Sequence, residues 1–300
     1  MKKMGTDKLL KYLSCFVAML IMTTNLIFAQ GKEKPQRCIL VFGSHADDVE
    51  SMAGGTFAKY IAEGYKGVYV CVMNNLAGCA IQGVGGGTSP RDNPGSVSVF
   101  SVSDSPLSYP VDALETSQIR KEEGLQAAKV FGAEPVFLDF CEPEIWLGRK
   151  LIIYGTDEFF KYCPPGRKQV SLATRYSEDI NFVVDLLRKY QPEITIIHTL
   201  GGEKLDHGES GYLMYLAFKE AMRKGVPVGK LWMRSHGWLS DKDAQKSGRG
   251  KPDIHINVKS YLKTKYEAFD KHVSQKGESR RQNRPEDATE EFITVIDNMN

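Results

Sequence analysis

RCILVFGSHADDVESMAGG, residues 37–55, carries the strongest structural signal in this chain. Residues 37–42 form a short, mostly apolar run, as expected of a strand that is buried on both faces of a sheet. A helix is predicted over residues 51–63, before Gly64. A histidine and two adjacent aspartates stand between the strand and the helix. Because two adjacent carboxylates repel each other, we expect another group to hold them in place.

The rest of the chain alternates between predicted strands and helices. The next strands are predicted at 67–73, 135–140 and 193–199, the helices at 117–132, 178–190 and about 209–224, and two further strands (230–235, 253–258) and a helix at about 260–274 follow. This alternation is typical of βαβ units. We therefore expect an α/β, Rossmann-like fold with a mainly parallel sheet and helices on both faces. Ligands bind such sheets beyond the carboxyl ends of the strands, where we place the active site.

Two long segments, at about 75–115 and 141–175, are predicted to be irregular. Each begins at the carboxyl end of a predicted strand, so both belong to the functional edge of the sheet, where they are expected to choose the substrate. Within the first, GVGGGTSPRDNPGS (83–96) is not a dinucleotide-binding fingerprint, because its glycines neither follow the strand closely nor open a helix.

The first 29 residues differ in composition from the rest. Four lysines precede the apolar run LSCFVAMLIM, and Ala29 stands at a plausible cleavage point. This pattern is typical of a signal peptide over residues 1–29, followed by a single domain over residues 30–300. We therefore expect an exported protein, periplasmic or extracellular in a bacterium, with no stable membrane span after cleavage. An uncleaved anchor is the alternative, although the run is short for a span.

Charge and cysteine content narrow the classes of partner and site. The leader carries four Lys and one Asp and the whole chain has a net charge of +2, so the remainder is about −1 and gives no indication of a nucleic-acid partner. Cys38 and Cys71 fall in predicted strands, where we expect them to be buried. Cys79, Cys141 and Cys163 fall in loops and allow at most one bridge, whose pairing the sequence leaves open. Because there is no CxxC pair, we do not expect a thiolate zinc site.

Two polar stretches place candidate metal ligands at the same edge of the sheet. His45 and Asp48 are three residues apart at a helix entrance, so their side chains can face one point while Asp47 points elsewhere. HTLGGEKLDHGESG (198–211) follows another predicted strand and contains His207. Two imidazoles and a carboxylate suit a catalytic zinc ion with an open position for water. Such an ion would also stabilise the adjacent carboxylates, one as a ligand and the other as a free base.

These motifs resemble the PIG-L/LmbE-like N-acetylglucosaminyl deacetylase family. HADDVESMAGG is similar to the family's His-Pro-Asp-Asp-Glu signature, and further family marks follow in order: IRKEEGLQAAKVFGAEPVFLDF (119–140), the Asp-His pair at 206–207, and KYEAFDKHVSQ (265–275). The resemblance covers roughly residues 37–280. It implies one Zn²⁺ per chain, held by His45, Asp48 and His207, with Asp47 as the general base.

The resemblance also implies an activity. We expect a secreted zinc-dependent deacetylase, a hydrolase that cleaves the acetamide of an N-acetylated amino sugar or glycoconjugate, whether small molecule or glycan. Zinc lowers the pKa of bound water to roughly 7, and Asp47 would take its proton. Two alternatives stay open: a zinc hydrolase of another amide or an ester, and a degenerate, non-catalytic sugar-binding protein. The sequence does not predict the oligomeric state.

The chain departs from the family pattern around the ligands. Ala46 stands for the usual proline, Val49 for the usual glutamate, and Asn74 and Asn75 for a common aspartate. These departures concern the catalytic detail and the substrate more than the metal. The Gly54–Gly55 pair is expected to let the helix pack close to the sheet.

Lys204 is a further catalytic candidate, and His198, Asp206 and His236 are candidates for substrate contacts. Lys204 stands where many relatives carry a histidine that contacts the oxyanion, and its ammonium can donate in the same way. A solvated surface lysine is the alternative, in which case His198 or His236 supplies the donor. His198, Asp206 and His236 are expected near the substrate, although a buried, hydrogen-bonded His198 fits the sequence equally well. His272 is expected to pack a helix.

Overall fold

A seven-stranded, mostly parallel sheet forms the centre of the computed structural model. Its strand order is β3-β2-β1-β6-β7-β9-β8. The strands are β1 (Cys38–Gly43), β2 (Lys66–Met73), β3 (Glu134–Phe140), β6 (Ile194–Ile197), β7 (Lys230–Arg234), β8 (Ile254–Asn257) and β9 (Thr289–Asp297). Neighbours from β3 to β7 are parallel, whereas β9 is antiparallel to both β7 and β8. The chain builds outward from β1 through β2 to β3 and then returns to β6, so the strand order reverses between β1 and β6.

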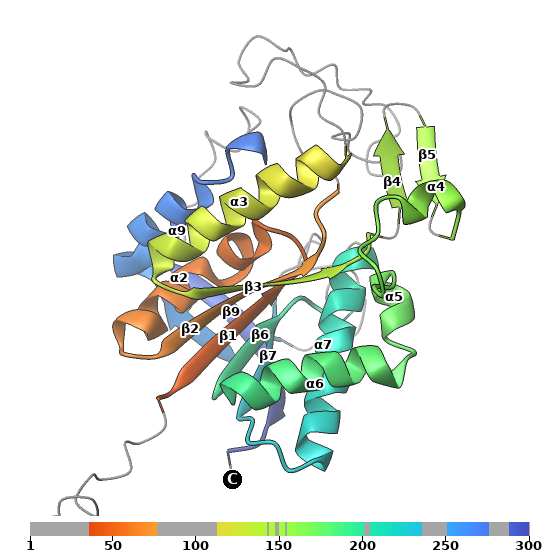
Figure 1. Cartoon of the computed structure of the whole chain (residues 1–300). Helices are drawn as coiled ribbons and strands as arrows, with labels where there is room; N and C mark the ends of the chain where they lie inside the picture. The colour runs from red at the N-terminus through yellow and green to blue at the C-terminus, as the bar shows by residue number, and fades with distance from the viewer. Residues whose placement is uncertain are drawn as a thin grey trace, which may run out of the picture. The chain divides into compact units, whose positions relative to one another are not determined.

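Helices cover both faces of this sheet (Figure 1). One face carries α2 (Asp48–Ala62), α3 (Ala113–Phe131) and α9 (Leu262–Phe269), and the other carries α6 (Ser177–Tyr190) and α7 (Leu205–Arg223). Alternate residues of β1 enter two separate apolar cores: Leu40 and Phe42 pack with α6 and α7, and Ile39 and Val41 pack with α2 and α3. The period of two explains why the strand is apolar throughout. The predicted Rossmann-like α/β fold is confirmed.

The structure describes residues 36–76, 113–142, 144–147, 150–153, 155–200, 205–235, 251–275 and 288–299. Those from Arg37 onward belong to one compact unit. The predicted signal peptide and most of the predicted loop at about 75–115 lie outside the described residues. Among the helices that are described, none has the length and apolar character needed to cross a membrane.

Several predicted boundaries differ from the observed ones. α2 begins at Asp48 rather than at residue 51, and α7 begins at Leu205 rather than at about residue 209. Both polar motifs therefore extend into first helical turns. Their side chains show no apolar periodicity, so the sequence pattern does not reveal where each helix starts. The helix predicted over about 260–274 is interrupted, because 3-10 turns at Lys259–Tyr261 and Val273–Gln275 flank a shorter α9.

Short elements and one strand escaped the sequence prediction. The segment at 141–175 contains the antiparallel pair β4 (Glu144–Leu147) and β5 (Lys150–Ile153) and the helices α4 (Asp157–Phe160) and α5 (Val170–Ala173). Four residues are too few to show a period. β9 was also missed, because acidic residues interrupt the apolar alternation of TEEFITVID.

A kink divides α2 in two. Ala53 has non-helical dihedral angles (φ −150°, ψ 18°), so the amides that follow it are free to bond elsewhere. The carboxylate of Glu290 on β9 accepts from Gly55 N (2.9 Å) and Thr56 N (2.7 Å), and Lys265 Nζ lies 2.7 Å from the same carboxylate. A Cβ on Gly55 would lie 2.6 Å from Val258 Cβ. The glycine therefore permits close packing against the segment that leads into α9, rather than against the sheet as predicted.

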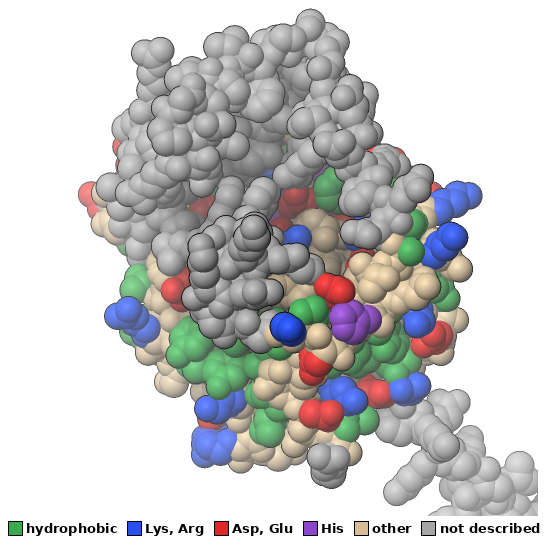
Figure 2. Space-filling model, turned by 180° about the vertical axis from the view of Figure 1, so that it is seen from behind, with side chains coloured by type: hydrophobic (Ala, Val, Ile, Leu, Met, Phe, Trp, Pro, Cys, Tyr) green, Lys and Arg blue, Asp and Glu red, His purple; other side chains and the backbone are tan. Residues whose placement is uncertain are grey.

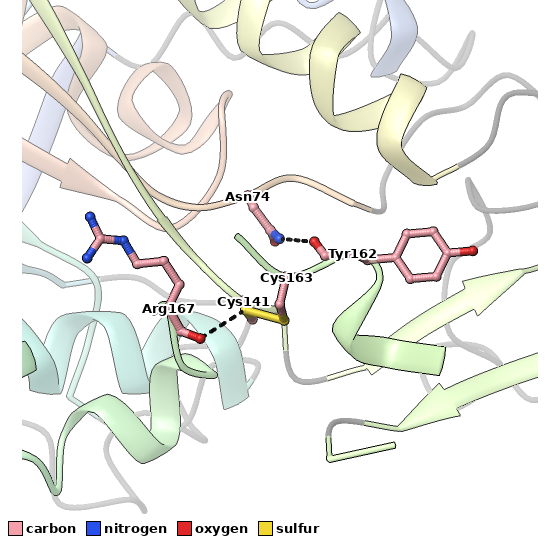
Figure 3. The surroundings of a disulfide bond; sticks show 5 residues. All are labelled: Asn74, Cys141, Tyr162, Cys163 and Arg167. Carbon is pink, nitrogen blue, oxygen red and sulfur yellow. Dashed lines mark hydrogen bonds between the residues drawn. A yellow bond between two sulfur atoms is a disulfide. The ribbon is translucent and has the colours of Figure 1, made fainter. Parts of the chain in front are cut away.

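A disulfide joins Cys141, at the end of β3, to Cys163 (Figure 3). Beside it, the side-chain nitrogen of Asn74 donates to the carbonyl of Tyr162 at 3.2 Å. The sequence allowed at most one bridge among the three loop cysteines without choosing the pair, and the structure joins Cys141 to Cys163. Cys38 and Cys71 are free and buried, which confirms that prediction, whereas Cys79 lies outside the described residues.

Charges of both signs are interspersed on the face of the molecule in Figure 2. Among the coloured side chains of that face, Lys and Arg alternate with Asp and Glu, and small apolar areas lie between them. The described part of this face therefore shows no extended area of positive charge of the kind that nucleic-acid-binding proteins carry.

Candidate metal centre

His45, Asp48 and His207 meet where the strand order reverses. β1 ends at Gly43 and leads into the first turn of α2, and β6 ends at Ile197 before α7 begins. Because β1 and β6 are neighbours, the entrances of α2 and α7 lie together at the carboxyl ends of the strands. The structure thus brings together the three residues that the sequence nominated as ligands.

A close approach of α7 to the end of β6 positions His207. A Cβ on Gly211 would lie 2.9 Å from the carbonyl oxygen of His198, so only glycine permits this approach. The His207 ring consequently stacks on the His198 ring, with centroids 4.4 Å apart. Asp206 Oδ1 accepts from the backbone N–H of His207 at 2.8 Å and so fixes the first turn of the helix.

The three candidate ligand atoms form a small triangle. His45 Nδ1 lies 3.3 Å from Asp48 Oδ2 and 3.3 Å from His207 Nε2, and these last two atoms are 3.5 Å apart. Atoms bound about 2.0–2.1 Å from a tetrahedral zinc ion lie about 3.3–3.4 Å from one another. The triangle therefore has the size that a zinc ion requires, and the residues present fit the metal.

The electrostatic surroundings also favour a cation. Burial alone would lower the pKa of His45, but the carboxylates of Glu142 and Asp48 raise it well above its ordinary value. Burial would raise the pKa of Asp48, yet the charges of His207 and His198 lower it well below its ordinary value. Burial lowers the pKa of His207, which favours the neutral ring that a metal ligand needs. The site thus combines an ionised Asp48, a neutral His207 and, around His45, carboxylates that attract positive charge.

Glu142 is a site residue that the sequence prediction missed. Its Oε2 lies 3.2 Å from His45 Nε2, and Asp206 Oδ2 lies 3.6 Å from the same atom. His45, Glu142 and Asp206 therefore form a second group of potential metal ligands. The available signal was position, because Glu142 follows the end of a predicted strand at the functional edge of the sheet.

Asp47 is not part of the candidate ligand group and has a cationic partner on α3. Arg120 Nη2 on α3 lies 3.2 Å from Asp47 Oδ1. The Asp47 side chain keeps 13% of its surface exposed, so substrate can reach it. Arg120 was not predicted as a site residue, although it lies in the family-like motif IRKEEGLQAAKVFG.

Asn75 holds the turn that carries His45. Its Oδ1 accepts from Ala46 N at 2.9 Å, and its Nδ2 donates to the carbonyl of Met73 at 2.9 Å. Its φ of 56° lies in the left-handed region, which asparagine adopts more readily than most residues. One of the two asparagines that depart from the family pattern therefore has a clear structural task.

Of the remaining candidates, the structure describes His198 and Asp206. His198 is fully buried, its Nε2 accepts from Ser44 N at 3.2 Å, and its ring stacks on that of His207. Of the two possibilities that the sequence left open for His198, the structure shows the buried one. Asp206 lies at the edge of the site with its side chain 18% exposed. Lys204 and His236 lie outside the described residues. His272 is buried, with Nε2 3.2 Å from Glu50 Oε1 on α2.

Comparisons with known proteins identify the family and the fold. The family model described as PIG-L: GlcNAc-PI de-N-acetylase matches residues 40–218, which include all three candidate ligands. The N,N'-diacetylchitobiose deacetylase from Pyrococcus horikoshii has a similar fold, with 15% identity over 98% of this chain and 95% of that chain and a TM-score of 0.53. The A40926 pseudoaglycone deacetylase Dbv21 has 17% identity over 88% and 99% of the two chains (TM-score 0.52).

A third similar structure has a different chemistry. The 4-carboxy-2-hydroxymuconate hydratase GalB from Pseudomonas putida has 18% identity over 88% of this chain and 98% of that chain, with a TM-score of 0.53. At such identities the likeness concerns the fold alone. The chemistry of this chain must therefore be argued from its own site and from the family match.

Proposed function

This chain belongs to the PIG-L family of de-N-acetylases, and we propose that it is a zinc-dependent hydrolase that removes the acetyl group from an N-acetylated amino sugar or glycoconjugate. The triangle of His45 Nδ1, Asp48 Oδ2 and His207 Nε2 carries the proposal, because its edges of 3.3–3.5 Å match the spacing of zinc ligands. Three protein ligands leave a position for water, as catalytic zinc sites do.

Asp47 supplies the proton transfers in this proposal. When bound, Zn²⁺ would provide an acidified water and a Lewis acid for the amide carbonyl. Asp47 would accept the proton of the attacking water and return it to the leaving amine. Arg120 Nη2 lies 3.2 Å from Asp47 Oδ1, so this carboxylate is oriented by an arginine. The His198 ring stacks on the ring of the candidate ligand His207 and accepts a hydrogen bond from Ser44 N.

The substrate class rests on the family and on the position of the loops. The β4–β5 hairpin and α4 lie beyond the carboxyl end of β3 (Figure 1), and the candidate site also lies at the carboxyl ends of the strands. Residues beyond strand ends commonly select ligands in α/β folds. We therefore assign the choice of sugar to the segments at about 75–115 and 141–175.

Export is a further part of the proposal. The signal-peptide pattern of residues 1–29 supports it, and so does the Cys141–Cys163 disulfide, since such bridges persist in oxidising compartments. We place the protein in the periplasm or outside a bacterial cell. Fractionation of an expressing cell should recover the chain there, shortened by the leader.

Two other functions fit the same ligands. A zinc hydrolase of another amide or an ester would use the same residues around the metal. A degenerate sugar-binding protein would keep the fold and lose turnover. The ion pair between Asp47 and Arg120 favours turnover, because a binding protein has no need of an oriented, partly exposed carboxylate one residue before a candidate metal ligand.

A substrate panel separates these functions. The zinc-loaded protein would be incubated with N-acetylglucosamine, its β-linked disaccharide, an O-acetylated sugar and an N-acetylated amino acid, while acetate and free amine are both measured. We expect equal release of acetate and amine from at least one N-acetylated sugar. Acetate release from the O-acetylated sugar or the N-acetylated amino acid alone would show that the substrate is an ester or another amide. Sugar binding without acetate release would identify a binding protein.

A further inference from the structure

Glu142 contacts the ring nitrogen of His45 that lies opposite the candidate ligand triangle. The distance from Glu142 Oε2 to His45 Nε2 is 3.2 Å, and the Glu142 side chain is only 4% exposed. Among the described residues, the second carboxylate oxygen of Glu142 has no hydrogen-bond partner. The bond to His45 is therefore the hydrogen bond that the structure shows for this buried carboxylate.

This contact determines which nitrogen of His45 can bind a metal. A carboxylate oxygen accepts hydrogen bonds, so in the neutral ring that a metal ligand needs the proton lies on Nε2. Nδ1 is then unprotonated, and it is the atom that lies 3.3 Å from both Asp48 Oδ2 and His207 Nε2. A carboxylate behind a ligating histidine fixes the ring's tautomer and orientation and raises its basicity.

A bulge at the end of β3 sets the direction of Glu142. Cys71 of β2 pairs with Phe137 and Met73 pairs with Phe140, so β3 contains one extra residue between these pairs. Asp139, inside the bulge, has a φ of 56°. One extra residue reverses the face to which the following side chains point. Glu142 therefore occupies the position that the preceding residue would take in a regular strand.

The residue before Glu142 is held by covalent and hydrogen bonds. Cys141 is fully buried and is joined to Cys163 by the disulfide in Figure 3. Its backbone N–H donates to the carbonyl of Lys168 at 2.9 Å, and its carbonyl accepts from Val170 N at 3.3 Å. These bonds leave the chain little freedom one residue before the carboxylate that contacts His45.

We propose that Glu142 is a positioning residue for His45, and that the Cys141–Cys163 disulfide holds it in place, so that the bridge controls metal affinity without touching the metal ligands. The proposal rests on the zinc site of the proposed function. It gives the disulfide, which lies outside the ligand triangle, an effect on the metal site.

The first test measures zinc affinity by competition with a chromophoric chelator. Loss of a carboxylate behind a metal-binding histidine typically weakens affinity 10- to 100-fold, and we expect this for Glu142→Ala. Glu142→Gln keeps an oxygen acceptor and should recover part of the loss. Glu134→Gln is the matched control: it removes a carboxylate from the opposite end of β3, where it pairs with Lys66, and it should leave the affinity unchanged.

The second test asks whether the disulfide acts through Glu142. Cys141→Ser/Cys163→Ser should weaken zinc binding, by no more than Glu142→Ala does. Combined with Glu142→Ala, the cysteine changes should cause no further loss, because effects that act through one contact do not add. Urea unfolding of each metal-free variant separates a loss of stability from a loss of affinity.

The outcomes distinguish this inference from the proposed function. A wild-type chain without stoichiometric zinc contradicts the proposed function. A zinc-binding wild type whose affinity survives Glu142→Ala overturns the inference alone, as do additive losses or an unaltered affinity in the cysteine variant. Two zinc ions in the wild type and one in Glu142→Ala would make Glu142 a ligand and would also overturn it.

Discussion

Asp47 and Asp48 are adjacent in sequence but have different partners. Asp48 lies among His45, His198 and His207, whereas Asp47 faces Arg120. The repulsion expected between neighbouring carboxylates is thus relieved separately for each one. This division also assigns their tasks, because the buried carboxylate suits a ligand and the partly exposed one suits a base.

The first prediction concerns the two histidines of the triangle. His45→Ala/His207→Ala removes two of three candidate ligands and leaves a single carboxylate, so we expect the purified variant to contain no stoichiometric zinc. Elemental analysis measures this directly. Full metal content in the double variant would show that the ion binds elsewhere.

The second prediction separates the base from the ligands. Asp47→Asn should keep the metal and the fold while activity falls by about 10²–10⁴-fold, the usual contribution of general acid–base catalysis. Zinc content and acetate release would be measured on one preparation. Loss of the metal in this variant would make Asp47 a ligand and exchange its role with that of Asp48.

The kink in α2 depends on a strand from the far end of the chain. The Glu290 carboxylate accepts from the amides of Gly55 and Thr56 and also binds Lys265, and it is almost fully buried. Such charge-assisted bonds are stronger than bonds between neutral groups. β9 therefore supports the helix whose first turn carries Asp48.

The third prediction follows from this cap. Glu290→Ala leaves two amides and the Lys265 ammonium without their acceptor, so we expect the free energy of unfolding to fall by on the order of 3 kcal/mol in urea titrations. Glu291→Ala is the matched control, because its partner His255 is exposed and surface pairs contribute about 0–1 kcal/mol. Equal losses in the two variants would contradict the capping role.

The fourth prediction concerns the hairpin of β4 and β5. Replacing residues 144–153 by a short Gly-Ser linker leaves Cys141 and Glu142 in place and should keep the zinc content unchanged. Because loops beyond strand ends select ligands, the variant should accept a different range of N-acetylated sugars. An unchanged profile across the substrate panel would remove the hairpin from substrate selection.

Local patterns were enough to predict the central fold and the triangle of candidate ligands. The buried strands have apolar runs, and the parallel topology brings their ends together, so His45, Asp48 and His207 could be nominated without coordinates. The roles of Glu142, Arg120 and Glu290 could not be predicted in this way. Their contacts span 97, 73 and 235 residues, and no local period records such a pairing. A bulge in β3 aims Glu142, and a kink in α2 frees the amides that Glu290 binds.

For the molecule as a whole, the central claim is that one zinc ion in the triangle enables deacetylation. The most direct measurement strips the metal, adds Zn²⁺ in fractions of an equivalent, and follows acetate release from the best N-acetylated sugar. The rate should start near zero, rise in proportion to added zinc and level off at one equivalent per chain. A stripped protein that keeps its full rate, or one that stays inactive after a full equivalent has bound, would contradict the claim.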